Sequence, residues 1–172
     1  MFAAEVLVTD IFYTKGMRIL GIDPGTGILG FGVVDSSAGA AKFVDAGVIR
    51  TPVNEADTIR LNTIFEEIVM IIKQAKPDVM SIEKLFFLRN VTTAMTVSQA
   101  RGVVLLAAVQ NKLPVFEYTP LQIKQAVTGY GRADKQQVQE MVKVLLGLKY
   151  LPQPDDAADA LAAAITHGMT VR

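Results

Sequence analysis

Hydrophobic and polar positions follow two different periods along the first half of the chain. Residues 17–23, 29–35 and 41–49 are short, largely apolar runs separated by turns of small residues, and this pattern predicts a three-strand meander. From residue 55 to 75 the isoleucines recur at helical spacing, and the pattern stops before Pro77. The meander is therefore expected to lead into a long helix.

The second half of the chain alternates between strand and helix patterns. Short apolar runs at 78–83 and 114–118 predict strands, and a long apolar segment at 92–111 predicts a helix between them. Three more helices are predicted by the residues at their ends. The first, 119–129, starts at Thr119-Pro120 and ends at Gly129, and the second, 135–146, follows a capping box of Asp134 and Gln137. The last runs from Asp155 or Asp156 to about His167. This order predicts one α/β domain with a mixed central sheet flanked by helices.

Four acidic residues stand where such a fold places ligands. Asp23 and Glu83 each follow an apolar strand directly, and ligands of open α/β sheets bind outside the carboxyl ends of strands. Asp156 and Asp159 are three residues apart and share one face of a helix rich in alanine, which allows close packing on a sheet. We therefore expect these four carboxylates to meet at one edge of the sheet.

Acidic residues at a strand end or in the first turn of a helix also have ordinary structural interpretations. An Asp before Pro-Gly, like Asp23, is typical of a turn, and Asp155 in a first helical turn is typical of a cap or of a charge that complements the helix dipole. Clustered carboxylates, however, need protons or cations, because two unit charges about 4 Å apart repel by ~4 kcal/mol at an effective dielectric of about 20. Oxygen ligands without His or Cys favour Mg²⁺ or Mn²⁺, and two such ions support phosphodiester hydrolysis.

Composition excludes several classes of site. The 172 residues are 51% hydrophobic, which is sufficient for a buried core, and the absence of Cys excludes disulfide scaffolds, thiolate zinc sites and cysteine nucleophiles. The single histidine, His167, is eleven residues beyond Asp156 and lies too far along that helix to share a metal ion with it. We therefore interpret His167 as structural.

The net charge of zero hides a segregation of charge along the chain. Residues 1–100 hold 9 basic and 11 acidic residues, residues 101–150 hold 7 and 3, and residues 151–172 hold 1 and 3. The basic segment is suited to the sequence-independent attraction of a phosphate backbone. Nucleic acid is therefore a candidate partner.

The first residues carry no secretory signal pattern, and no apolar run reaches 18 residues. We expect a cytoplasmic protein with a single domain over residues 17–172. Residues 1–16 are expected to be an N-terminal extension that is either disordered or the result of a start codon assigned upstream of the natural start at Met17.

Six short blocks occur in order over about residues 17–167. They are Arg18–Gly27, Ser81–Phe87, Ser98–Gly102, Lys124–Gly129, Asp134–Gln139 and Asp156–Ala162. Together the blocks resemble the RuvC family of bacterial Holliday junction resolvases. The resemblance implies a ribonuclease H-like three-layer fold and an endonuclease of recombination and repair. Such an enzyme nicks two opposed strands of a four-way DNA junction and leaves 5′-phosphate and 3′-hydroxyl ends.

The resemblance also implies residue roles. The family's four catalytic, metal-binding carboxylates match Asp23, Glu83, Asp156 and Asp159, whereas Asp155 falls outside the motif. They would hold two Mg²⁺ or Mn²⁺ ions.

Further matching residues would contact the DNA. Phe86 matches an aromatic residue that stacks at the opened junction, and Lys124 and Lys135 match lysines near the scissile phosphate. Lys135 is the residue that we expect to stabilise the charge of the transition state. Arg89 and Arg132 are expected as secondary phosphate contacts.

Two symmetric nicks imply a homodimer, with the helix near residues 92–109 as the expected interface. The RuvA–RuvB branch-migration complex is a further expected partner. The alternatives are a related nuclease for structured RNA, a junction-binding scaffold without catalysis, and an ATP-handling protein of the sugar kinase and Hsp70 type, which needs two such domains.

Overall fold

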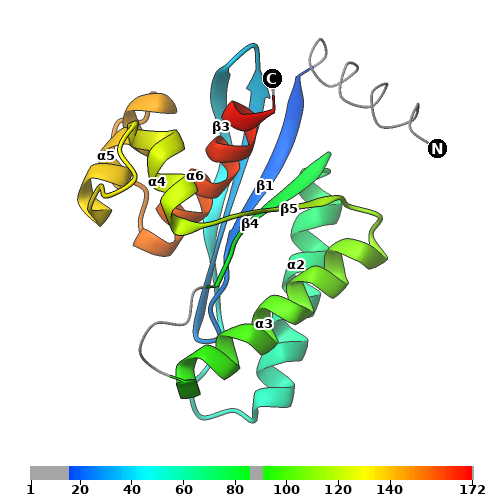
Figure 1. Cartoon of the computed structure of the whole chain (residues 1–172). Coiled ribbons are helices and arrows are strands. Elements are labelled where there is room, and N and C mark those ends of the chain that lie inside the picture. Colours follow the sequence, from blue (N-terminus) through cyan, green and yellow to red (C-terminus); the bar gives the residue numbers. More distant parts are fainter. Residues whose placement is uncertain (1–15, 86–90, 172) are drawn as a thin grey trace, which may run out of the picture.

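Five strands form one mixed sheet in the order β3-β2-β1-β4-β5 (Figure 1). The structure is a computed structural model that describes residues 16–85 and 91–171. The strands are β1 (Met17–Asp23), β2 (Ile28–Ser37), β3 (Ala40–Arg50), β4 (Val79–Glu83) and β5 (Val115–Tyr118). β1, β2 and β3 pair antiparallel, whereas β1–β4 and β4–β5 pair parallel. The predicted meander and mixed sheet are confirmed.

Helices cover both faces of the sheet (Figure 1). They are α2 (Asp57–Ala75), α3 (Val91–Gln110), α4 (Pro120–Thr128), α5 (Lys135–Leu145) and α6 (Asp155–Thr170). Side chains of α2 and α3 share one buried cluster with the sheet, and those of α4, α5 and α6 share the cluster on the opposite face. The predicted three-layer α/β architecture is therefore confirmed.

The predicted helix ends are also found. Thr119 and Asp134 each close a capping box, with Gln122 and Gln137 respectively, and Gly129 ends α4 in the left-handed conformation. α6 continues to Thr170, beyond the end expected near His167, because its last turn stays hydrogen-bonded up to Val171. No helix of residues 16–85 and 91–171 is long and apolar enough to cross a membrane.

Glycines allow α6 to lie unusually close to the two central strands. A Cβ atom added to Gly21 of β1 would be 2.0 Å from the carbonyl oxygen of Ala160, and one added to Gly30 of β2 would be 2.0 Å from that of Asp156. Every residue from Ala160 to Ala164 is buried. The alanine-rich sequence of α6 is therefore matched by glycines on the sheet.

His167 lies inside the α6 layer and is 1% exposed. Its Nδ1 is 2.8 Å from the hydroxyl oxygen of Tyr118, and its ring lies against that of Phe116 with a centroid distance of 4.3 Å. Burial lowers the pKa of His167 from 6.5 to about 4. The structural interpretation of this histidine is confirmed.

Acid should weaken the fold through this residue. Between pH 6.5 and pH 4 the unfolded chain binds a proton that folded His167 does not, so His167 contributes a loss of unfolding free energy of roughly 3 kcal/mol as the pH falls through this window. Urea unfolding at several pH values should show this loss in the wild type and a smaller one in His167→Gln, which keeps a polar partner for Tyr118. Parallel pH curves for the two proteins would contradict the assignment.

Candidate active site

The carboxyl ends of two strands and the start of α6 meet at one place. Asp23 ends β1 and pairs in the sheet with Gly30, the residue whose Cα lies against the backbone of Asp156. On the other side of β1, Ile22 pairs with Ile82, so Glu83 follows at the neighbouring strand end. These contacts bring Asp23, Glu83 and the start of α6 to the edge of the sheet at which the four acids were expected.

A cavity of about 230 Å³ opens beside these strand ends. Its lining includes Glu83, Asp159, Lys124 and Lys135. The two lysines come from α4 and α5, which pack on α6 on the same side of the sheet. Four of the residues predicted for the site thus surround one space.

Electrostatics show that the four carboxylates interact. The pKa of Asp23 is raised to about 8, first by burial and then by the charges of Asp159, Glu83 and Asp156. Burial and the charge of Asp159 also raise the pKa of Glu83, against the opposing effect of Lys124 and Lys135. Burial raises the pKa of Asp159 as well, although its hydrogen bond with Lys135 opposes the increase. The site therefore brings together acidic groups whose charge has to be compensated by protons or by a cation.

Lys135 supplies part of that compensation. Its Nζ lies 2.5 Å from Oδ2 of Asp155 and 3.0 Å from Oδ2 of Asp159. Partial burial lowers the pKa of Lys135, but the hydrogen bonds to the two carboxylates outweigh this effect and the pKa lies above its ordinary value. The ammonium group is therefore charged where it meets Asp159.

The donor set fits a hard divalent cation in its chemistry. Asp23, Glu83, Asp156 and Asp159 offer only oxygen ligands, and their mutual repulsion would be relieved by a bound cation. Over the described ranges, 16–85 and 91–171, no three His, Asp or Glu side chains already surround one metal position. Binding through Asp159 would therefore require side chains to adjust and Lys135 to move off that carboxylate.

The remaining predicted DNA contacts are distributed differently. Phe86 and Arg89 lie outside the described residues. Arg132 is exposed on the loop between α4 and α5, outside the lining of the cavity. Its proposed contact with DNA would therefore lie outside the cavity that the carboxylates and lysines line.

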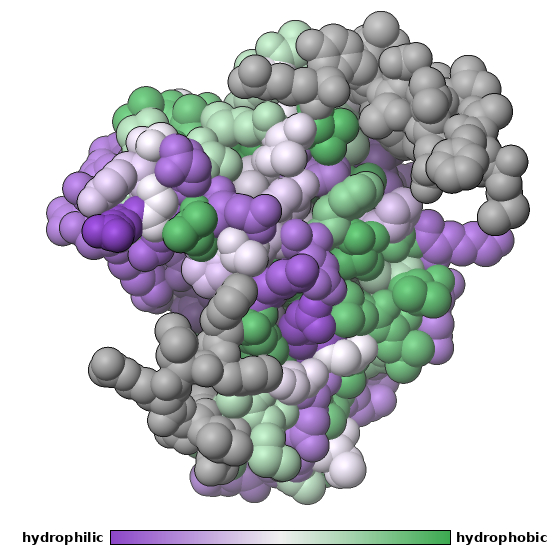
Figure 2. Space-filling model, in the orientation of Figure 1, coloured by the Kyte–Doolittle hydropathy of each residue, from purple (hydrophilic) through white to green (hydrophobic). Residues whose placement is uncertain are grey.

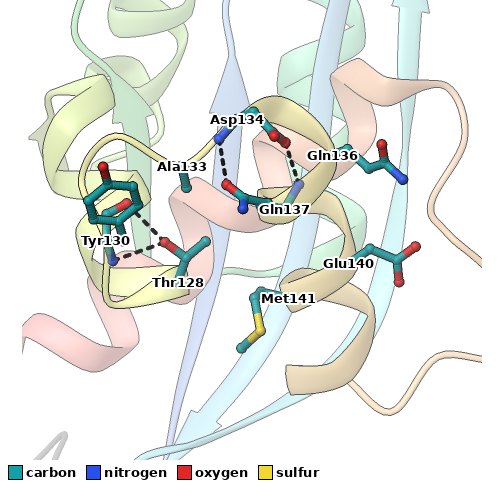
Figure 3. A pocket seen from close by; sticks show the side chains of 8 residues that line it. All are labelled: Thr128, Tyr130, Ala133, Asp134, Gln136, Gln137, Glu140 and Met141. Carbon is teal, nitrogen blue, oxygen red and sulfur yellow. Dashed lines mark hydrogen bonds between the residues drawn. The ribbon is translucent and has the colours of Figure 1, made fainter.

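A second cavity, of about 430 Å³, lies between the same loop and the outer side of α5 (Figure 3). Tyr130 and Met141 line it, and its Asp134 and Gln137 hydrogen-bond to each other's backbone in the capping box. None of the predicted catalytic or DNA-binding residues lines this cavity. We therefore place the candidate site at the smaller cavity.

Sequence reasoning missed the contact between Asp155 and Lys135. Asp155 was expected to cap α6 or to complement its dipole. Pro154 is the N-cap residue, so Asp155 does not cap the helix, but it lies in the first turn, where its charge complements the dipole and also meets Lys135. The available signal was the spacing of Asp155 and Asp159, since residues four apart share a helix face. What spacing could not reveal is that α5 brings a lysine to that face.

Comparison with known proteins identifies close relatives. The sequence matches the family described as crossover junction endodeoxyribonuclease RuvC over residues 19–167. A protein of that name from Brevibacillus brevis is 58% identical over 151 residues, which are 88% of this chain and 91% of the relative. One from Desulfitobacterium hafniense is 56% identical over 155 residues, 90% of this chain and 94% of the relative.

Solved structures agree with this similarity. Thermus thermophilus RuvC in complex with Holliday junction substrate superimposes with a TM-score of 0.86 at 39% identity, over 91% of this chain and 95% of that chain. The yeast mitochondrial Holliday junction resolvase Ydc2 superimposes with a TM-score of 0.69 at 12% identity, over 95% of this chain and 82% of that chain. The second similarity is one of fold alone.

Proposed function

The chain belongs to the crossover junction endodeoxyribonuclease RuvC family, and on that basis we propose how its own residues resolve Holliday junctions. The enzyme is an endonuclease of DNA recombination and repair that acts on four-way junction DNA. The gathering of Asp23, Glu83, Asp156 and Asp159 beside two lysines is the observation that supports the catalytic assignment. A nuclease for structured RNA and a scaffold without catalysis are not favoured.

The roles of the residues follow from their positions. Asp23, on the central strand, and Glu83, on its neighbour, would hold the metal ions from the sheet, while Asp156 and Asp159 would hold them from α6. Family nucleases depend on divalent metal ions, and two Mg²⁺ or Mn²⁺ ions would activate the attacking water and stabilise the departing 3′ oxygen. The carboxylates fix the geometry in which that chemistry occurs.

The two lysines would bind the DNA strand at the cut. Lys124 and Lys135 line the cavity beside Glu83 and Asp159 and place positive charge next to the carboxylates. A positive group there stabilises the negative charge that develops on a phosphate under attack. Phe86 and Arg89, close after Glu83 in the sequence, and Arg132 are proposed as additional contacts to the junction.

Cleavage of a synthetic mobile four-way junction tests this function directly. We expect paired nicks at symmetric positions in Mg²⁺ or Mn²⁺, with ends that a ligase rejoins, because hydrolysis leaves 5′-phosphate and 3′-hydroxyl groups. A chelator should abolish cleavage and leave junction binding measurable. Binding without nicks in both metals, or a preference for structured RNA, would refute the proposal.

Two coordinated nicks further imply two copies of the site, related by a two-fold axis. α3 presents the exposed apolar residues Met95, Leu106 and Val109, and Figure 2 shows hydrophobic surface in the part of the view where α3 lies in Figure 1. We assign this face of α3 to a homodimer interface. The RuvA–RuvB branch-migration complex is a further proposed partner.

Disruption of this face should separate the two copies. Leu106→Asp places a charge in the proposed interface, so light scattering at working concentration should show a dimer for the wild type and a monomer for the variant. Val144→Asp is the matched control, since Val144 is equally apolar and exposed but lies on α5. A monomeric wild type, or equal effects of the two substitutions, would contradict the interface.

A further inference from the structure

Lys135 is held by two acids, and only one of them belongs to the proposed metal set. Its Nζ is 3.0 Å from Oδ2 of Asp159 and 2.5 Å from Oδ2 of Asp155. The side chain of Asp159 is 26% exposed, whereas that of Asp155 is 49% exposed. Lys135 therefore bridges a half-buried catalytic acid and a more accessible one.

The backbone fixes this arrangement from both sides. Lys135 is the first residue of α5, and the capping box of Asp134 and Gln137, with two bonds of 2.9 Å, sets the direction in which that helix starts. Asp155 and Asp159 are one helical turn apart on α6 and present their carboxylates to the same side. The bridge thus follows from the packing of α5 on α6.

A divalent cation at Asp159 would compete directly with the ammonium group of Lys135. Without a second partner, the lysine would have to leave a carboxylate and remain unpaired beside a doubly charged ion. Asp155 provides that second partner at 2.5 Å without itself belonging to the metal set. When the metal ion binds Asp159, Lys135 gives up its ion pair with Asp159 but keeps the one with Asp155. This lowers the electrostatic cost of binding the metal ion.

We propose that Asp155 is a positioning residue that keeps Lys135 beside the reacting phosphate when a metal ion takes Asp159. The inference rests on the proposed function, because it assigns Asp159 to the metal. Asp155 acts through Lys135 and contacts neither the metal nor the substrate in this role. A purely structural Asp155, which complements the dipole of α6, would change stability but not the response of Lys135 to metal.

Metal binding to the DNA-free protein gives the first test. By calorimetry, Asp155→Asn should bind Mg²⁺ about two- to fivefold more weakly than the wild type, the scale of a solvent-accessible ion pair, and Asp155→Glu should restore most of the affinity. In a Lys135→Met background the same Asp155→Asn substitution should have a smaller effect, since only the long-range influence of one charge remains. Equal effects in both backgrounds would overturn the proposal.

Glu140→Gln serves as the matched control. Glu140 is an exposed acid on α5, the helix that carries Lys135, and makes no ion pair within the described residues. Its substitution removes the same charge without touching Lys135, so it should leave Mg²⁺ affinity close to that of the wild type. If Glu140→Gln loses as much Mg²⁺ affinity as Asp155→Asn, the effect of Asp155 is that of any nearby negative charge, and the positioning role is refuted.

The second test observes Lys135 itself. A paired, protonated lysine reacts slowly in reductive methylation, and mass spectrometry reports the rate for this one residue. In the wild type the rate should stay low with and without Mg²⁺, whereas in Asp155→Asn the addition of Mg²⁺ should raise it several-fold. An identical Mg²⁺ response in the two proteins would contradict the proposal.

Failure of the inference and failure of the proposed function have different signatures. If the wild type neither binds Mg²⁺ nor cuts a junction in it or in Mn²⁺, the proposed function is wrong. If the wild type binds and cuts but Asp155→Asn matches it in affinity and in labelling, only the role of Asp155 is wrong.

Discussion

Asp23→Asn should reduce junction cleavage by about three orders of magnitude or more, which corresponds to a loss of at least ~4 kcal/mol of transition-state stabilisation. Asp23 is the carboxylate whose pKa responds to all three other acids, so it lies where their charges meet. Asn keeps the size of the side chain but removes the charge that holds a cation. Single-turnover cleavage in Mg²⁺ and Mn²⁺ measures the loss.

Binding and folding should survive this substitution. The proposed phosphate contacts come from Lys124 and Lys135, so the junction affinity measured by fluorescence anisotropy should change little. Folded Asp23 has a pKa of about 8 and an ordinary value of 3.8, so its ionisation costs stability as the pH rises through this interval. The metal-free variant should therefore be more stable than the wild type at pH 8 and above. Full cleavage activity in Asp23→Asn would discard the assignment of the site.

Gly30→Ala should lower the unfolding free energy by about 3 kcal/mol. The added Cβ would lie 2.0 Å from the carbonyl oxygen and 2.5 Å from the carbonyl carbon of Asp156, so backbone rather than a flexible side chain has to move. The same displacement would shift Asp156 and Asp159 away from Asp23, so the cleavage rate should also fall. Urea unfolding and single-turnover cleavage measure the two effects.

Gly27→Ala is the matched control for this prediction. Gly27 lies on the turn between β1 and β2, and a Cβ there would meet only Nη2 of Arg60, at 3.7 Å, which is an ordinary van der Waals contact. This substitution should therefore change the unfolding free energy by less than about 1 kcal/mol. If Gly30→Ala unfolds at the same urea concentration as the wild type, α6 can move away from the sheet without loss of stability, and the prediction is wrong.

The location of the site was predictable because it depends on where strands end. Asp23 and Glu83 each follow an apolar run that predicts a strand. The alternation of strands and helices indicates that these two strands are parallel, so their carboxyl ends lie at the same edge of the sheet. The place of Asp156 and Asp159 was predictable for a different reason, since an alanine-rich helix packs closely on a sheet. Local pattern was sufficient in both cases.

The partners of Lys135 were not predictable in this way. That Lys135 bridges Asp155 and Asp159 depends on the angle at which α5 meets α6, a tertiary contact between segments separated by an irregular stretch. The Tyr118 partner of His167 likewise comes from β5, 49 residues earlier. Spacing along one helix reveals which residues share a face, but not what another element presents to it.

The glycine contacts of α6 have a consequence for how the enzyme moves. Two of the four proposed catalytic acids lie on a helix whose backbone touches the backbone of β1 at Gly21 and of β2 at Gly30. Because such contacts separate only when the core itself opens, the acids belong to the last part of the molecule to unfold. We therefore expect the edge of the sheet that carries these acids to stay rigid while the protein is folded. Within residues 16–85 and 91–171, the α4–α5 side of the site, where side chains rather than backbones meet, has more freedom to adapt to the shape of a junction.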